Sequence, residues 1–220
     1  MGVKLLNQKE LEFGAAILDL GSEKISFGIF KNLALVHSIT FPIGINHITK
    51  DISKVCSLNL DESENIRNNI DFLFQNSQKI FDENNYLKKI YFIDSGFRKI
   101  SKDLILSVVK ARLDEIFDIL KKQLIVPGFY LASGINLLLA AGGSNLFNIE
   151  KYFINFFGPN VKTAEKNSVE KDENLEKNFA SCLGALEIIK DGWETEAIPE
   201  AVNQNIEKIS FFAKIFKINR

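Results

Sequence analysis

The sequence predicts an α/β fold in which helices flank a mixed β-sheet. Three short apolar runs lie within the first 41 residues and are separated by small polar turns, the pattern of a strand meander. Beyond them, apolar strand-like runs alternate with segments of helical periodicity. The chain has 220 residues, of which 46% are hydrophobic and 25% charged. It is therefore long enough for one large domain, or two small lobes, around a buried core.

The meander follows a lead-in of residues 1–13. Three strands are predicted, over residues 14–20, 25–30 and 33–41. A tight polar turn at residues 21–24 joins the first two strands, and Lys31-Asn32 makes a two-residue hairpin link to the third. Each of the first two strands is therefore expected to pair with the strand that follows it.

Two helices are expected after the meander. The first runs from about residue 46 to residue 56, and three apolar residues share one of its faces: Ile48, Ile52 and Val55. The second contains Ile66 and Ile70, and Asp61 or Ser63 is the expected N-cap.

Strands and helices then alternate. A strand at residues 90–93 precedes a long helix that begins at the N-cap Ser101 and ends at Lys122. Its inward residues are Leu104, Val108, Leu113, Ile116 and Leu120. The later elements are a strand at 137–140, a helix from about 145 to 157, an edge strand from Val161, a charged loop at 163–177 and a packed helix at 179–190. These elements form one lobe over residues 14–190, followed by a linker at 191–205 and a separate helix at 206–220.

Composition argues against several classes of protein. Lys and Arg number 27 against 28 Asp and Glu, so the chain lacks the basic excess of a dedicated nucleic-acid binder and no nucleic-acid partner is expected. The two cysteines and two histidines have no zinc-site spacing, so no metal site is expected. Cys56 and Cys182 are predicted to be buried thiols in the reducing cytosol. The apolar stretches fall well short of the roughly 20 residues that a membrane span needs.

Asp19, Gly21 and Ser22 lie at the turn between the first two strands. An acidic residue at a strand end followed by Gly suits a phosphate-binding hairpin, because Gly lets the backbone approach phosphate oxygens and successive N–H groups can bind an anion. Taken alone, the same residues also fit an ordinary hairpin.

A second turn follows the apolar run Leu139-Ala140-Ala141 and contains Gly142, Gly143, Ser144 and Asn145. It is expected to open a helix, so its backbone and the helix N-terminus could meet a ligand together. Glycine is also common at turns between packed elements that bind no ligand. Two glycine turns roughly 120 residues apart in one α/β chain are more specific than either alone.

The order of these elements resembles the C-terminal half of the FtsA family, actin-like cell-division proteins of bacteria with a ribonuclease H-like lobe. AAILDLGSEKISFGIF is similar to the family's second phosphate motif, FPIGINHITKDI to its Gly-x-x-x-(I/V)-Thr-x-Asp-Ile stretch, and LAAGGSN to its adenosine motif. The resemblance is carried, in chain order, by residues 15–30, 41–52, 64–67, 101–124, 139–145, 183–185 and 206–220.

The resemblance implies that the chain binds ATP with Mg²⁺. It assigns the phosphates to Asp19, Gly21 and Ser22, the ribose to the Glu-x-x-Lys/Arg pair Glu64 and Arg67, and the adenosine to Gly142, Gly143, Ser144 and Asn145. By residue type alone, Asp61 to Arg67 also fit a solvated acidic first turn of a helix.

Two departures from the family pattern limit this expectation. The family's second phosphate loop reads Asp-x-Gly-Gly-Gly-Thr, whereas this chain has Asp-Leu-Gly-Ser-Glu-Lys and so places Glu23 where phosphates would approach. A carboxylate there repels phosphate unless Lys24 or a metal offsets it. The family's first lobe also has no counterpart in this sequence, so the chain supplies one wall of a nucleotide cleft. We therefore expect at most weak ATP hydrolysis.

Residues 206–220 predict an amphipathic helix that binds anionic membrane lipid. Basic charge together with Phe and Ile at a chain end is typical of interfacial helices, and the family carries its membrane anchor at this position. The expected membrane-binding residues are Ile209, Phe211, Phe212, Lys214, Ile215, Phe216 and Lys217. By pattern alone, the same helix could instead dock on its own lobe.

The resemblance implies an adaptor that tethers FtsZ filaments to the membrane. Its expected partners are the FtsZ C-terminal tail, anionic lipid and further copies of itself in filaments, and its expected location is the cytoplasmic face of the inner membrane at the division site. One alternative is a half-site of another actin-superfamily ATPase or phosphotransferase, although Asp19 is the only candidate general base. Another is an actin-like adaptor of the pilus-assembly type.

Overall fold

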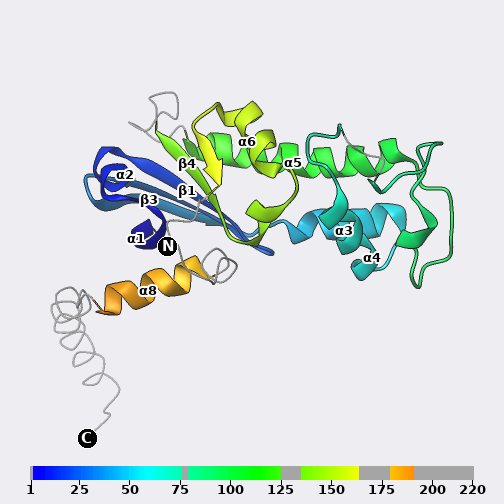
Figure 1. Cartoon of the computed structure of the whole chain (residues 1–220), viewed down its shortest axis with the longest axis horizontal. Helices are drawn as coiled ribbons and strands as arrows, with labels where there is room; N and C mark the ends of the chain where they lie inside the picture. The colour runs from blue at the N-terminus through cyan, green and yellow to red at the C-terminus, as the bar shows by residue number, and fades with distance from the viewer. Residues whose placement is uncertain (1, 76–78, 125–134, 164–178, 191–220) are drawn as a thin grey trace, which may run out of the picture.

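The computed structural model describes residues 2–75, 79–124, 135–163 and 179–190. It confirms a mixed five-stranded sheet flanked by helices, with strand order β3-β2-β1-β4-β5 (Figure 1). The strands are β1 (Ala15–Leu20), β2 (Ile25–Lys31), β3 (Ala34–Phe41), β4 (Asn136–Ala140) and β5 (Val161–Thr163). Neighbouring strands of the meander are antiparallel, β4 is parallel to β1, and β5 is parallel to β4.

The second hairpin link lies one residue later than predicted. Lys31 pairs with Ala34, so the two linking residues are Asn32 and Leu33 rather than Lys31-Asn32. Both adopt positive φ, 52° and 62°. This is the turn that the right-handed twist of a hairpin requires, and Asn tolerates it well.

Helix α3 (Asn46–Cys56) confirms the first predicted helix, with one correction to its inward face. Val55 is 49% exposed, whereas Cys56 is buried. Ile48, Thr49, Ile52 and Cys56 form the buried face, which is rotated away from Val55.

Helix α4 (Leu60–Asn69) is capped by Asn59, so the predicted caps Asp61 and Ser63 were wrong. The Asn59 side chain accepts the Glu62 N–H at 2.7 Å, and the Glu62 carboxylate accepts the Asn59 N–H at 3.1 Å. This reciprocal capping box satisfies two backbone donors that a helix start leaves unpaired.

The strand predicted at residues 90–93 was also wrong. A single turn of 3-10 helix, η2 (Lys89–Tyr91), occupies this position. Tyr91 is buried, while Ile90 and Ile93 are 74% and 65% exposed. The apolar run is therefore not a core strand, because most of it faces outward.

Helix α5 (Lys102–Leu124) confirms the long predicted helix. The Leu104 N–H donates to Ser101 Oγ at 3.3 Å, as an N-cap requires. Three of the predicted inward residues, Leu113, Ile116 and Leu120, are buried, but Leu104 is 41% exposed.

Helix α6 (Ile149–Phe157) begins later than the predicted residue 145. A 3-10 turn, η4 (Gly142–Asn145), follows β4 instead, and Asn148 adopts φ 62° just before α6. A non-helical residue there prevents α6 from extending back to the glycine pair.

Three helices lie over the face of the sheet opposite α5 and α6 (Figure 1). They are α1 (Gly2–Leu5), α2 (Gln8–Phe13) and α8 (Ala180–Lys190). The lead-in is thus helical, with α2 starting at an Asn7 capping box. Most described residues of α8 are exposed, and Cys182 is exposed rather than buried as predicted. Its outward face has no described neighbour to cover it.

One large core joins the sheet to α3, α4, α5 and α6, and a smaller cluster under α1 and α2 contains Leu6, Ala15, Ile17, Leu138 and Ala140. Most of the predicted charged loop, the linker at 191–205 and the helix at 206–220 lie outside the described residues. Within the described ranges, no helix combines the length and apolar character needed to cross a membrane.

Candidate functional site

The two predicted glycine turns meet at the carboxyl ends of β1 and β4. These strands are parallel neighbours, and Asp19 pairs with Ala140. Gly143 packs directly on the end of β1: a Cβ at Gly143 would lie 2.6 Å from the Leu20 carbonyl oxygen. Segments roughly 120 residues apart in sequence therefore form one surface at the carboxyl ends of these two strands.

The first turn is anchored to the start of α3. The N–H groups of Ile45 and Asn46 donate to the carbonyl oxygens of Gly21 and Ser22 at 3.0 and 2.8 Å. Gly21 has no room for a side chain, since an added Cβ would lie 2.4 Å from the Lys24 carbonyl oxygen. The turn is thus held by its carbonyl groups, while the Ser22 side chain is exposed.

Glu23 is engaged by α3. Its carboxylate accepts from Asn46 Nδ2 at 2.6 Å and from Lys50 Nζ at 2.7 Å. These two hydrogen bonds lower the pKa of Glu23, with the Asn46 bond making the larger contribution. Lys50, rather than the Lys24 or metal considered from the sequence, therefore offsets this charge.

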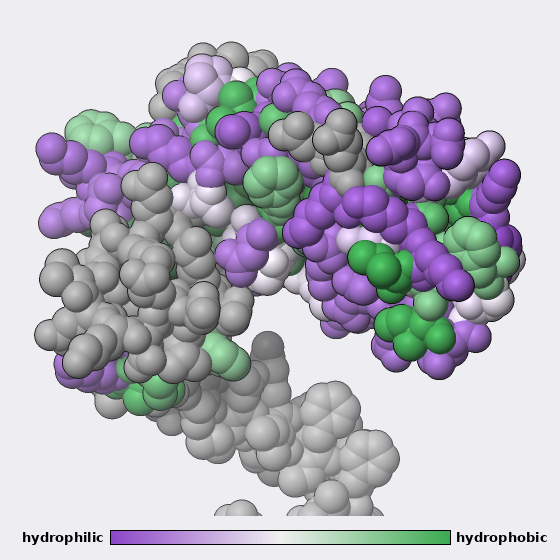
Figure 2. All heavy atoms as spheres, turned by 45° about the vertical axis from the view of Figure 1, so that its right-hand side comes forward, coloured by the Kyte–Doolittle hydropathy of each residue, from purple (hydrophilic) through white to green (hydrophobic). Residues whose placement is uncertain are grey.

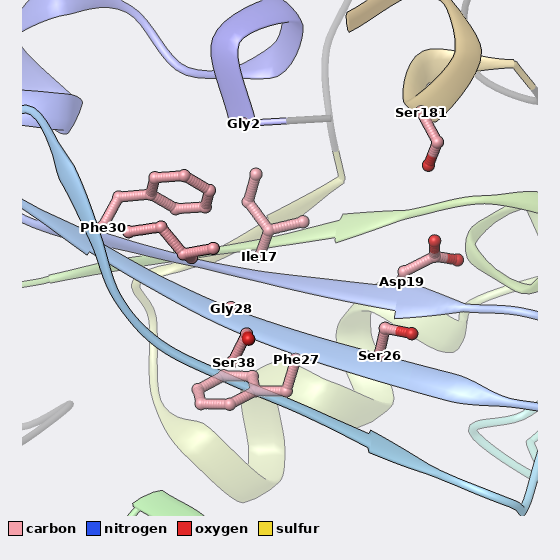
Figure 3. A pocket seen from close by; sticks show the side chains of 10 residues that line it. Gly2, Ile17, Asp19, Ser26, Phe27, Gly28, Phe30, Ser38 and Ser181 are labelled. Atoms are coloured by element: carbon pink, nitrogen blue, oxygen red, sulfur yellow. The ribbon is translucent and has the colours of Figure 1, made fainter. Parts of the chain in front are cut away.

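Asp19 faces a pocket of about 290 Å³ on the α8 side of the sheet. Figure 3 shows its carboxylate at the end of β1, beside Ser26 of β2 and on the same side of the sheet as Ser181 of α8. Burial raises the pKa of Asp19. The carboxylate is therefore partly withdrawn from solvent at the strand end where the predicted phosphate site lies.

The residues of the second turn divide into two exposed and two buried positions. Gly142 and Asn145 are exposed, whereas Gly143 and Ser144 are buried. The Ser144 hydroxyl donates to the Ala141 carbonyl oxygen at 2.7 Å and closes the turn. Because α6 begins only at Ile149, this turn offers exposed backbone but not the helix N-terminus that the sequence predicts.

Glu64 and Arg67 form an ion pair on α4, with 2.8 Å between Arg67 Nη2 and Glu64 Oε1. The Arg67 side chain is 10% exposed and that of Glu64 53% exposed. Arg67 Nη1 also donates to Thr49 Oγ1 at 2.8 Å, and its Nε to Asn68. Arg67 is thus fixed between α3 and α4, and Glu64 is the accessible member of the pair.

Helix α4 is tied to the segment after the second turn. Phe72 N–H donates to the Phe147 carbonyl oxygen at 3.1 Å, and Asn148 Nδ2 donates to Asp71 Oδ1 at 2.8 Å. All three predicted nucleotide motifs are therefore linked through α3, α4 and the residues that flank them.

Sequence reasoning missed Glu62, a buried carboxylate that accepts five hydrogen bonds in the described part of the chain. Glu62 Oε1 accepts the N–H groups of Ile93, Asp94 and Ser95 at 2.6 to 2.9 Å. Burial opposes ionisation, but hydrogen bonds from Ser95, Asn59 and Asp94 outweigh it and lower the pKa of Glu62 to about 2. The capping-box spacing from Asn59 to Glu62 was the only available signal.

Glu62 and the three backbone N–H groups that it binds, at residues 93–95, are called the Glu62 clamp below. Exposed hydrophobic side chains gather around this clamp. Figure 2 turns the side with α3 and α4 forward and shows hydrophobic side chains among hydrophilic ones there. The exposed large hydrophobic residues of this part are Val55, Leu60, Ile90, Ile93 and Phe97. Such gatherings on soluble proteins often mark protein-binding surfaces.

The predicted membrane-binding residues all lie outside the described residues. In the part of the chain that the structure describes, no group of three or more His, Cys, Asp or Glu residues is placed to hold a metal ion.

Comparison with known proteins identifies a family. The family model described as "Cell division protein FtsA" matches residues 16–184. Relatives with this name include one from Neisseria meningitidis, 25% identical, over 84% of this chain and 45% of the relative. Another, from Buchnera aphidicola, is 23% identical over 97% of this chain and 51% of the relative. The chain thus spans about half the length of the curated relatives it matches.

Solved structures share the actin-like fold. MreB5 of Spiroplasma citri bound to AMPPNP matches with a TM-score of 0.59 and 22% identity, over 94% of this chain and 59% of that one. A MamK double helical filament matches with a TM-score of 0.55 and 15% identity, over 86% and 57%. The type IV pilus complex PilM-PilN matches with a TM-score of 0.55 and 15% identity, over 80% and 46%.

Proposed function

The chain belongs to the FtsA family of cell-division proteins, and we propose that it acts as an FtsA-type adaptor. In this proposal it links FtsZ filaments to the cytoplasmic face of the inner membrane at the division site, associates with further copies of itself and binds ATP mainly in a structural role. The observation that carries the proposal is the meeting of the two glycine turns at the ends of β1 and β4, beside α3 and α4.

The nucleotide would lie against the carboxyl ends of β1 and β4. The exposed backbone at Gly142 and the exposed Asn145 and Ser22 are open to a ligand. Asp19 supplies a partly buried carboxylate at the end of β1. Gly21, Gly143 and Ser144 would act by shaping the two turns rather than through their side chains. These features suit the binding of the phosphates and the adenosine of a nucleotide. MreB5, a structural relative, has been solved bound to AMPPNP and to ADP.

Glu64 is the residue that we assign to the ribose. Its side chain is half exposed, whereas every nitrogen of the Arg67 guanidinium already has a partner. Arg67 would therefore position Glu64 and join α4 to α3. ATP with Mg²⁺ is the proposed ligand, and any hydrolysis is expected to be weak because Glu23 replaces a glycine of the family's phosphate loop.

Membrane binding is assigned to residues 206–220. The test is co-sedimentation with anionic vesicles, comparing the full chain with a chain that ends at Asn205. We expect only the full chain to pellet with lipid, because the basic and apolar residues of the amphipathic pattern lie beyond Asn205. Equal sedimentation of both chains would remove the membrane assignment.

The exposed hydrophobic surface around the Glu62 clamp is a suitable site for the FtsZ tail. Binding of an FtsZ C-terminal tail peptide would favour the division adaptor over a pilus-assembly adaptor. We expect Ile93→Lys to weaken this binding, because Ile93 is 65% exposed within that surface. The matched control is Ile189→Lys on α8, where the side chain is 51% exposed. Equal effects of the two variants would place the peptide elsewhere.

A further inference from the structure

The two edges of the sheet are built differently. Strand β5 is three residues long and carries an exposed lysine, Lys162, at its centre. Strand β3 is eight residues long, ALVHSITF, and contains no charged residue and no proline. Short length, lysine, proline and β-bulges are the usual means by which proteins prevent an edge strand from pairing with another chain. By these criteria β5 is protected, whereas β3 has one register shift, at Val36, and is open to pairing from His37 to Phe41.

The outer side of β3 is accessible in the part of the chain that the structure describes. β3 lies at the end of the strand order and pairs only with β2. The register shifts at Val36, which has no partner on β2 and is 56% exposed. From His37 to Phe41 the pairing with β2 is regular. This segment therefore presents a regular row of outward backbone groups.

A hydrophobic patch adjoins this edge. Leu33 and Leu35 are 58% and 54% exposed, and Phe13 of α2 is 73% exposed. The hairpin tip is fixed to the end of α2, because the N–H of Leu33 donates to the Leu11 carbonyl oxygen at 2.9 Å. The patch of Phe13, Leu33, Leu35 and Val36 is therefore held beside the strand edge.

We propose that β3 pairs antiparallel with β3 of a second copy of this chain, so that one sheet continues through both copies. A two-fold axis places the strand opposite itself, and an uncharged strand then sets no like charges against each other. The same axis places one copy of the hydrophobic patch at each end of the paired strands. This inference rests on the self-association proposed above and names the surface that carries it.

The test is sedimentation velocity of the full chain over a range of concentrations, without lipid. We compare Val36→Lys with the matched control Ile189→Lys, because Ile189 is 51% exposed but lies on α8, outside the proposed interface. We expect the wild type and Ile189→Lys to dimerise alike. Val36→Lys should raise the dissociation constant about tenfold or more, because it places a charged side chain in the hydrophobic patch that the pairing covers. Leu35→Lys is a second variant in case Val36→Lys alters the hairpin.

The outcomes distinguish an error in the assigned surface, β3, from an error in the proposed self-association. If the wild type associates and both edge variants associate equally well, β3 is not the interface, although self-association remains. If the wild type stays monomeric at every concentration, both the β3 pairing and the proposed self-association in solution are wrong. Far-UV circular dichroism of each variant must match that of the wild type for these readings.

Discussion

Gly143 offers a direct test of how the two turns are joined. In Gly143→Ala, the added methyl group would lie 2.6 Å from the Leu20 carbonyl oxygen and 2.7 Å from both Leu20 Cβ and Ile45 Cγ1. Real Cβ atoms hardly ever approach other heavy atoms this closely. One of the crowded atoms belongs to the backbone of β1, so the strand end and the second turn must separate.

Overpacking of this kind costs about 1–3 kcal/mol of unfolding free energy. The matched control is Gly142→Ala, because a Cβ at Gly142 meets nothing within 4 Å. We expect the control to change stability by less than about 0.5 kcal/mol, or to stabilise slightly by restricting the unfolded chain.

Urea unfolding followed by far-UV circular dichroism measures the difference. With a slope of about 2 kcal/mol/M, a loss of 2 kcal/mol lowers the midpoint by about 1 M. Equal midpoints for the two variants would refute the close packing of the second turn on β1.

Two further predictions concern the Glu62 clamp and the thiols. Glu62→Gln should destabilise the chain by about 2–3 kcal/mol at neutral pH, because hydrogen bonds to a buried charge are lost, whereas the exposed Glu64→Gln should cost well under 1 kcal/mol. The folded pKa of Glu62 is lowered from 4.5 to about 2. The carboxylate therefore stabilises the fold fully above about pH 5 and loses this effect as the pH falls toward 2, so acid unfolding curves of wild type and Glu62→Gln should converge there. In the native chain, the exposed Cys182 should react with a maleimide, while Cys56, which is buried and has a raised pKa, should react only after unfolding. Rapid native labelling of Cys56 in a Cys182→Ser variant would contradict its burial.

The elements with a clear period were predictable from sequence. The meander, α3 and α5 have apolar residues at strand or helix spacing, and the structure places them within a residue or two of the predicted bounds. The errors come from interactions between distant segments. Residues 90–93 are as apolar as a core strand, but the N–H of Ile93 donates to the buried Glu62 of α4, and those of Tyr91 and Phe92 donate within the 3-10 turn. No local pattern contains that information.

The candidate site was predictable in part. Gly21 and Gly143 were identified as turn residues of the candidate nucleotide site, and the structure gives each a steric reason to be glycine. The pairing of Glu23 with Lys50 was not foreseen, because it joins residues 27 positions apart through the start of α3. The contact of Arg67 with Thr49 escaped prediction for the same reason.

The central claim is that the ends of β1 and β4, together with α4, form one wall of a nucleotide site. The most direct measurement is a titration of the isotope-labelled chain with ATP and Mg²⁺, followed through the backbone amide signals by NMR. We predict shifts concentrated at Ser22, Gly142, Asn145 and Glu64 at millimolar nucleotide. Shifts that map to another surface, or no shifts in this range, would contradict the claim.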